Sequence, residues 1–251
     1  MTTATEPART SETIDIAVVA GPTSPGTSAD WELFFARRAL AKLKSRLGQQ
    51  ALLELLEPDI ADSARTLKAW ADSSQGQWRP ALTRLRVRGI STGEFVSYFM
   101  SITGDQPKLL AAQPEHFVLV EAGDGPSHVI RVVENLSRYI SDFYITFTGE
   151  DQAVAELAPD YPAARMVGTV ALADGTTIGH ALHQFRETTD GFDALLAIYF
   201  PAAAPEEFIE GHRQHLAVEF TNWIVGAAES LGRTSNSPVP LVVTGTEHYR
   251  S

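Results

Sequence analysis

Apolar and polar positions divide the chain into a helical front, a strand-rich middle and a helical end. Apolar residues recur at helical spacing over residues 31–48, where Gly48 marks a stop, and again over 50–73. Pro58 lies inside the second stretch and predicts a break or kink there. From residue 83 the pattern changes to alternation, which is typical of half-buried strands.

The middle of the chain predicts one strand, a helical segment and then six strands in quick succession. The segment 91–114 is expected to form one helix, or two helices broken near Gly104. Asp-Gly pairs, such as Asp174-Gly175 and Asp190-Gly191, are the strongest short-range signal for hairpins. The expected strands are 82–89, 116–123, 128–135, 139–149, 165–172, 176–188 and 192–201.

One long helix is predicted after the last strand, over residues 205–232. Pro205 lies near its first turn and Gly232 closes it. An antiparallel sheet with one apolar face needs a cover, and this helix is the available one. We therefore expect an α+β fold in which an antiparallel, curved sheet of six to seven strands grips a long C-terminal helix, with an N-terminal helical extension.

These elements suggest four segments. Residues 1–29 are expected to be a flexible leader with a short strand and turn, 30–80 a helical extension, 81–232 the main domain and 233–251 a tail. The order of elements over residues 83–232 resembles the helix-grip fold of the START and birch-pollen-allergen superfamily. That resemblance rests on architecture, and it implies an apolar cavity between the sheet and the last helix.

Composition narrows the function classes. The net charge of −11 disfavours a nucleic-acid partner, and the basic cluster at 37–46 is best interpreted as a solvated helix face. The chain has no cysteine, which excludes disulfides, thiolate nucleophiles and cysteine-bound zinc. No segment is apolar enough for a membrane span or a signal peptide, so we expect a cytoplasmic protein without a membrane partner. The sequence leaves the oligomeric state open, with a homodimer as one alternative.

The last helix carries the densest set of reactive side chains. His212, His215 and Glu219 fall along one margin of an apolar stripe, and His215 and Glu219 are neighbours at a spacing of four. Three interpretations are open: a zinc or iron site built from His215, Glu219 and His212, a metal-free general acid/base (His212 or His215) oriented by Glu219, or a solvated helix edge. Sheet residues that are candidates to complete a metal site are His116, His128, Glu134, His180 and His183.

The pair His215-x-x-x-Glu219 is also similar to one in a helix-grip enzyme family. Carbon–carbon-bond hydrolases acting on acylphloroglucinols bind zinc partly through a His-x-x-x-Glu pair on the C-terminal helix. This resemblance implies a zinc-assisted hydrolase. The tryptophan-rich segment expected in that family is missing here.

Strand parity leaves the orientation of two further candidates open. His180 and His183 point to opposite faces, and His183 is the inward, catalytic candidate if Ala181 and Phe185 face the core. Arg131 shares a face with Val129 and Val133, and an inward Arg131 would anchor a ligand carboxylate or enolate. The expected ligand-binding residues are Arg131, Phe143, Phe185, Tyr199 and Trp223.

The sequence thus predicts an enzyme acting on a small, mostly apolar metabolite, aromatic or polyketide-like, held in an internal cavity. The expected chemistry is of the hydrolase, cyclase or lyase type, with His212, His215, Glu219 and His183 as catalytic candidates. The alternative is a carrier that binds a hydrophobic small molecule without chemistry.

Overall fold

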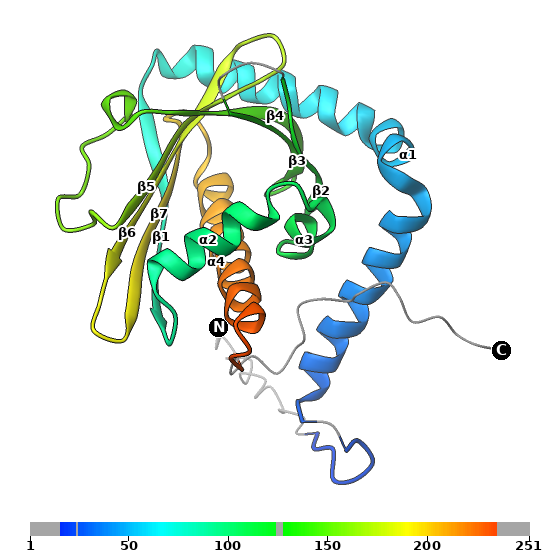
Figure 1. Ribbon diagram of the computed structural model, residues 1–251. Coiled ribbons are helices and arrows are strands. Elements are labelled where there is room, and N and C mark those ends of the chain that lie inside the picture. The colour runs from blue at the N-terminus through cyan, green and yellow to red at the C-terminus, as the bar shows by residue number, and fades with distance from the viewer. Residues whose placement is uncertain (1–15, 24, 124–127, 235–251) are drawn as a thin grey trace, which may run out of the picture.

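The structure is a computed structural model that describes residues 16–23, 25–123 and 128–234. It opens with a long helix, α1 (Ser28–Ser74), whose first part projects from the rest of the fold and whose second part packs against the sheet (Figure 1). Thr27 begins α1 through a capping box with Asp30, in which each side chain accepts a hydrogen bond from the other's backbone N–H. Of the predicted short strand over 13–20, residues 16–20 carry no regular secondary structure and residues 13–15 lie outside the described residues.

Helix α1 changes direction at Gly48 and not at Pro58. Gly48 has φ 72° and ψ 165°, a conformation that glycine adopts without steric cost. The helix continues through Pro58, so the break predicted there is wrong. Pro58 removes the hydrogen bond to the carbonyl of Glu54, but both residues are exposed, and that carbonyl can be solvated instead.

Seven antiparallel strands form one sheet in the order β1-β7-β6-β5-β4-β3-β2, which confirms the predicted sheet. The first strand pairs with the last, so the order along the chain does not match the order in space. Pro80 lies in β1, an edge strand, where its missing N–H costs no ladder hydrogen bond. The strands are β1 (Trp78–Arg88), β2 (His116–Glu121), β3 (Val129–Leu136), β4 (Tyr139–Thr148), β5 (Ala164–Ala171), β6 (Thr177–Glu187) and β7 (Gly191–Pro201).

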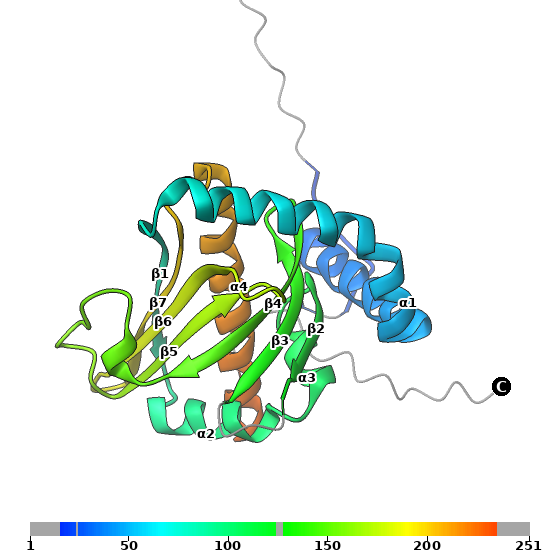
Figure 2. The same ribbon diagram turned by 90° about the horizontal axis from the view of Figure 1, so that it is seen from above.

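Helix α4 (Glu206–Ser230) lies inside the curve of the sheet, as Figures 1 and 2 show. Two short helices, α2 (Thr92–Ile102) and α3 (Gln106–Ala111), cross one end of the sheet, which confirms the alternative of two helices. A single 3-10 turn (Glu150–Gln152) joins β4 to β5. This α+β arrangement is compatible with a helix-grip fold.

The core fills the space between the sheet and α4. Phe95 of α2 contacts the rings of Phe185, Phe192 and Phe220, and all four side chains are buried. At the other end of α4, a Cβ on Gly211 would lie 2.8 Å from Cβ of Ser137, so a glycine is needed where α4 meets the β3–β4 turn. Because α4 packs this closely on the turn, the position of the following residue, His212, which lines the cavity between α4 and the sheet, is fixed as well. Among the described helices, none combines the length and hydrophobicity needed to cross a bilayer.

Candidate metal centre

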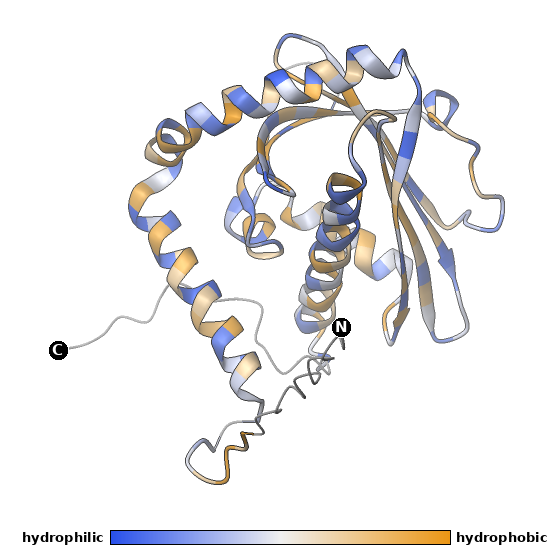
Figure 3. Cartoon of the chain, turned by 180° about the vertical axis from the view of Figure 1, so that it is seen from behind, coloured by the Kyte–Doolittle hydropathy of each residue, from blue (hydrophilic) through white to orange (hydrophobic). Residues whose placement is uncertain are grey.

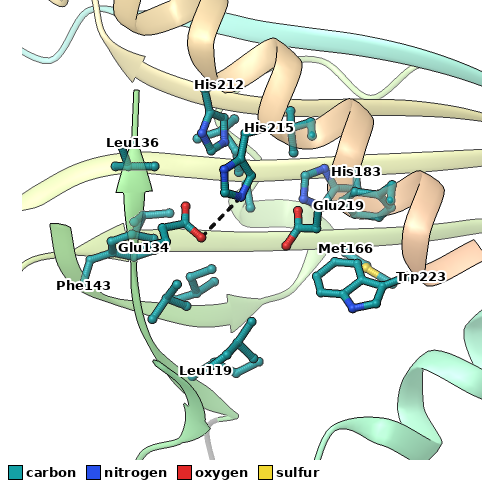
Figure 4. Close-up of a pocket in the computed structure, with 18 of the residues that line it drawn as sticks. Leu119, Glu134, Leu136, Phe143, Met166, His183, His212, His215, Glu219 and Trp223 are labelled. Atoms are coloured by element: carbon teal, nitrogen blue, oxygen red, sulfur yellow. Dashed lines mark ion pairs between the residues drawn. The ribbon is translucent and has the colours of Figure 1, made fainter. Parts of the chain in front are cut away.

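A cavity of about 100 Å³ lies between α4 and the inner face of the sheet. Its walls are mostly aliphatic and aromatic, and its polar groups come from three histidines, two glutamates and Trp223 (Figure 4). The lining residues are Phe99, Leu119, Ile130, Val132, Glu134, Leu136, Phe143, Ile145, Phe147, Met166, Val170, Ala181, His183, Ile198, Phe200, His212, His215, Leu216, Glu219, Phe220 and Trp223.

Helix α4 contributes the three residues that its sequence singles out. His212, His215 and Glu219 all line the cavity because they lie beside the buried apolar stripe of α4. The two histidine side chains are 4% exposed each, which removes the interpretation of a solvated helix edge. Their rings stack at an interplanar angle of 11° with centroids 5.2 Å apart.

Two neighbouring strands supply the partners of these residues. His116 opens β2 and pairs directly with Glu134 of β3, so both side chains project from the same face of the sheet. His116 is fully buried, and Glu134 is 5% exposed. Of the five sheet residues that the sequence left open as ligands, His116 and Glu134 are the two that meet the α4 cluster.

His116 Nε2 is the atom at which these side chains meet. His116 Nε2 lies 3.1 Å from His215 Nε2, 3.1 Å from a Glu134 carboxylate oxygen and 3.4 Å from one of Glu219. His215 Nε2 lies 3.5 Å from Glu134, the pair marked by a dashed line in Figure 4. In that view the Glu134 side chain comes from the strand and those of His215 and Glu219 from α4, pointing toward each other.

Backbone contacts around this cluster hold the start of β2 against α1 and α4. Lys44 of α1 donates hydrogen bonds to the carbonyls of Pro114 at 2.6 Å and His116 at 2.5 Å. Asn222 of α4 donates to the carbonyl of Ala112 at 2.6 Å. The His116 side chain is therefore positioned from two helices, and Lys44 is a contributor that the sequence pattern did not single out.

The ionisable groups of the cluster shift one another's pKa values. Burial opposes ionisation of Glu134, but the charge of His215 and the hydrogen bond and charge of His116 outweigh it and lower its pKa. Burial raises the pKa of Glu219, although His116 and His215 oppose this shift. Burial alone would lower the pKa of His215, but Glu134, Glu115 and Glu219 raise it to about 9. Two buried carboxylates thus compete for positive charge on the histidines.

Two further histidines of the cavity are held neutral. Burial, with the nearby charge of His215, lowers the pKa of His212 to about 3, and burial lowers that of His183 to about 4. His183 Nδ1 accepts a hydrogen bond from the backbone N–H of Ala197 at 3.3 Å. The neutral His183 ring therefore carries its proton on Nε2 and is a hydrogen-bond donor.

The spacing of the donor atoms fits a metal ion. A tetrahedral zinc site with bonds of about 2.0–2.2 Å places its ligand atoms about 3.3 Å apart. The separations of 3.1 to 3.5 Å that His116 and His215 make with each other and with the glutamates are close to that value, whereas Glu134 and Glu219 fall into two different groups of donor atoms. Donor atoms of His116, His215 and Glu219 form one group within 4.8 Å of each other, and those of Glu134, His212 and His215 form a second. These buried groups could hold a metal, and two imidazoles with two carboxylates suit zinc or iron.

The structure separates the remaining candidate residues by face. His183 lines the cavity together with Ala181, whereas His180 packs against Trp78 on the other face. Phe143 and Trp223 line the cavity, and Phe185 lies behind it in the phenylalanine core.

Arg131, Tyr199 and His128 lie away from this cavity. Arg131 points to the outer face of the sheet and forms a two-bond ion pair with Asp142, at 3.0 and 2.7 Å, so the expected inward anchor is not formed. Tyr199 does not line the cavity, because alternate residues of its strand, Ile198 and Phe200, face inward instead. His128 is exposed and packs on Phe147.

No protein-family model matches this chain, and no curated protein is similar to it in sequence.

Proposed function

We propose that this chain is a metal-dependent hydrolase that cleaves a carbon–carbon bond beside a ketone carbonyl in a small, mostly apolar molecule. The observation that carries this proposal is that Glu134, His215 and Glu219, which line a mostly apolar cavity, gather around the buried His116. The resemblance of His215-x-x-x-Glu219 to the pair in zinc-dependent acylphloroglucinol hydrolases supports the same assignment, as does the sheet that grips α4.

The four residues would hold zinc, or iron as the second choice. A metal ion in such a site polarises a carbonyl oxygen and lowers the pKa of bound water toward neutrality. The protein supplies the remaining conditions. The apolar walls exclude bulk water, and aromatic side chains such as Phe143 and Trp223 hold an aromatic ring. The Nε2–H of His183 donates a hydrogen bond to a carbonyl or to the oxyanion formed from it.

The proposed reaction consumes one water molecule and needs no oxidant or reductant. The hydroxyl group of water is added to the carbonyl carbon, the bond from that carbon to the ring breaks, and the released ring carbon receives the proton. The products are a carboxylic acid and the shortened arene. The leaving carbon must carry negative charge, which favours a hydroxylated aromatic ring or a β-dicarbonyl compound as substrate.

A second candidate function is transport or storage of a hydrophobic ligand. The specific observation in its favour is that most of the cavity wall is apolar. A carrier, however, gains nothing from two buried carboxylates facing two histidines, because burying charges costs free energy unless they are matched. The cluster therefore favours the enzyme.

Hydrolysis in H₂¹⁸O tests the proposal. The chain is stripped of metal, loaded with zinc and incubated with acylated phenols and aryl β-diketones, and the products are analysed by mass spectrometry. We expect zinc-dependent release of a carboxylic acid that carries one ¹⁸O atom from water. Glu219→Gln should abolish this release, whereas His180→Ala, on the opposite face of β6, should retain it. A zinc-loaded protein that binds these compounds without converting them would favour the carrier, and a protein that binds no zinc would contradict both the site and the reaction.

A further inference from the structure

The first half of α1 lies apart from the body of the protein. Residues before Gly48 extend beyond the sheet, and Figures 1 and 2 both show this segment projecting from the fold. Lys44 connects it to the body through the carbonyls of Pro114 and His116 and through the ring of Phe117. The rest of this half-helix is largely exposed, so packing against the body of the protein does not account for the apolar residues on its surface.

Apolar residues follow this half-helix in a heptad pattern. The intervals between them alternate three, four, three and four residues, which is the spacing of the a and d positions of a coiled coil. They span about 21 Å of helix at 1.5 Å per residue. The seam, as we name it, consists of Leu33, Ala36, Leu40, Leu43 and Leu47.

The seam is exposed where a coiled coil would bury it. Leu33, Leu43 and Leu47 are 46%, 61% and 45% exposed, and Leu40 is half-buried. Within the described residues, α1 contacts strands of the sheet, and its three seam leucines with the greatest exposure remain uncovered. Figure 3 shows the alternation of hydrophobic and hydrophilic positions along this segment.

The charges flanking the seam suit a second copy in parallel orientation. With Leu33, Leu40 and Leu47 at a positions, Glu32 takes a g position and Arg37 the following e position. In a parallel pair, g of one helix lies beside the following e of its partner, so Glu32 meets Arg37 twice across a two-fold axis. The other g–e pair before Gly48 is Ala39 with Lys44, and it places no like charges together.

We propose that two copies of this chain associate through the seam, as a parallel pair of α1 half-helices. Each seam leucine then packs into a hole on the partner helix. The pair also holds the helix that carries Lys44, and through it the backbone of His116, so assembly supports the geometry of the candidate metal centre without contributing a residue to it. The proposal does not depend on the reaction that the cavity performs.

Sedimentation equilibrium of the full chain tests the association over roughly 1 to 100 µM. We expect a reversible monomer–dimer equilibrium, and Leu43→Glu should raise the dissociation constant by at least about tenfold, because it places a charge in the seam. Leu55→Glu is the matched control, since Leu55 is 65% exposed on the same helix beyond Gly48. Circular dichroism verifies that both variants fold.

Disulfide cross-linking tests whether the two half-helices pair in parallel. The chain has no cysteine, so Leu43→Cys introduces a single thiol at a d position. In a parallel pair the two thiols face each other, and mild oxidation should give a disulfide-linked dimer, whereas Leu55→Cys should stay uncrosslinked. A wild-type chain that remains monomeric up to about 100 µM, or a Leu43→Glu variant that dimerises like the wild type, overturns the proposal. So does a monomer that binds anionic lipid vesicles through this face.

Discussion

The two faces of the sheet treat buried carboxylates in different ways. On the outer face, Asp193 accepts hydrogen bonds from Arg86 at 2.9 Å and from Arg186 at 2.5 Å. On the inner face, Glu134 and Glu219 contact histidines, and their negative charges repel each other. Within the described part of the chain, neither of them is paired with an arginine or a lysine. Both faces bury negative charge, but the outer face alone supplies permanent positive charge.

This difference distinguishes carboxylates that stabilise the fold from carboxylates that are candidates for a functional role. A carboxylate paired with two guanidinium groups is satisfied in the folded protein, so its role is structural. A carboxylate that faces imidazoles is satisfied only if those rings bind a proton or a metal ion. The inner cluster therefore depends on a bound proton or metal ion in a way that the outer pairs do not, and perturbed ionisable groups of this kind concentrate at functional sites.

The largest expected effect is stabilisation by zinc. If the inner cluster binds the ion, zinc at about 1,000 times its dissociation constant should stabilise the fold by about 4 kcal/mol, because it binds the folded state alone. Glu134→Gln should remove this stabilisation, since it deletes a charged ligand. Thermal unfolding of the metal-free chain with and without zinc measures the difference. Asp193→Asn, on the outer face, should retain the zinc effect in full.

The next effect concerns the support of His116. Lys44→Met removes the two hydrogen bonds to the carbonyls of Pro114 and His116, and we expect zinc affinity to fall by about 10–100-fold, as is usual when a ligand loses its outer support. Isothermal titration gives the affinity. Lys42→Met is the control, because Lys42 is exposed on the same helix. Equal affinities in the two variants would show that Lys44 does not position the site.

A smaller effect is expected on the outer face. The hydrogen bonds and charges of Arg86 and Arg186 lower the pKa of Asp193 to about 2, below its value in an unfolded chain. The ionised side chain therefore contributes stability above about pH 4, and this contribution is lost as the pH falls through about 2. Asp193→Asn should cost about 1 kcal/mol at pH 7, after allowance for solvent around the arginines, and close to nothing at pH 2. Urea unfolding at both pH values measures this, and a cost that does not shrink in acid would contradict the assignment.

The smallest effect is expected from Arg131. Arg131→Met breaks its ion pair with Asp142, which is partly exposed, and should cost less than about 1 kcal/mol. Because Arg131 lies outside the cavity, zinc affinity and ligand binding should stay unchanged. A loss of ligand binding in this variant would mean that the side chain reaches the cavity after all.

Local patterns were sufficient to predict most of the fold. Two-residue alternation and the Asp-Gly turns at 174–175 and 190–191 predicted the hairpins, because both signals act between neighbours in sequence. The stop predicted at Gly48 is confirmed as the point where α1 changes direction, whereas the second break predicted at Pro58 does not form. Pro58 is the stronger helix breaker by type, but its neighbours are exposed and tolerate it, so Gly48 became the point of change.

The candidate site could be predicted in part. His215 and Glu219 meet because of helical spacing, which is visible in the sequence. Their partners His116 and Glu134 meet through strand register, and that register contains an irregularity between His116 and Val118 that no local pattern indicates. Arg131 shows the same limit, since parity gives two alternating faces without saying which one is inside.

Zinc titration of the metal-free chain tests the central claim most directly. By isothermal calorimetry at neutral pH, the wild-type chain should bind one zinc ion per chain, and His116→Ala and Glu134→Gln should each lose that binding while remaining folded. Both residues come from the sheet and not from the His-x-x-x-Glu pair, so their loss tests the assembled site. A wild-type chain that binds no zinc, or two sheet variants that bind it as tightly as the wild type, would contradict the account.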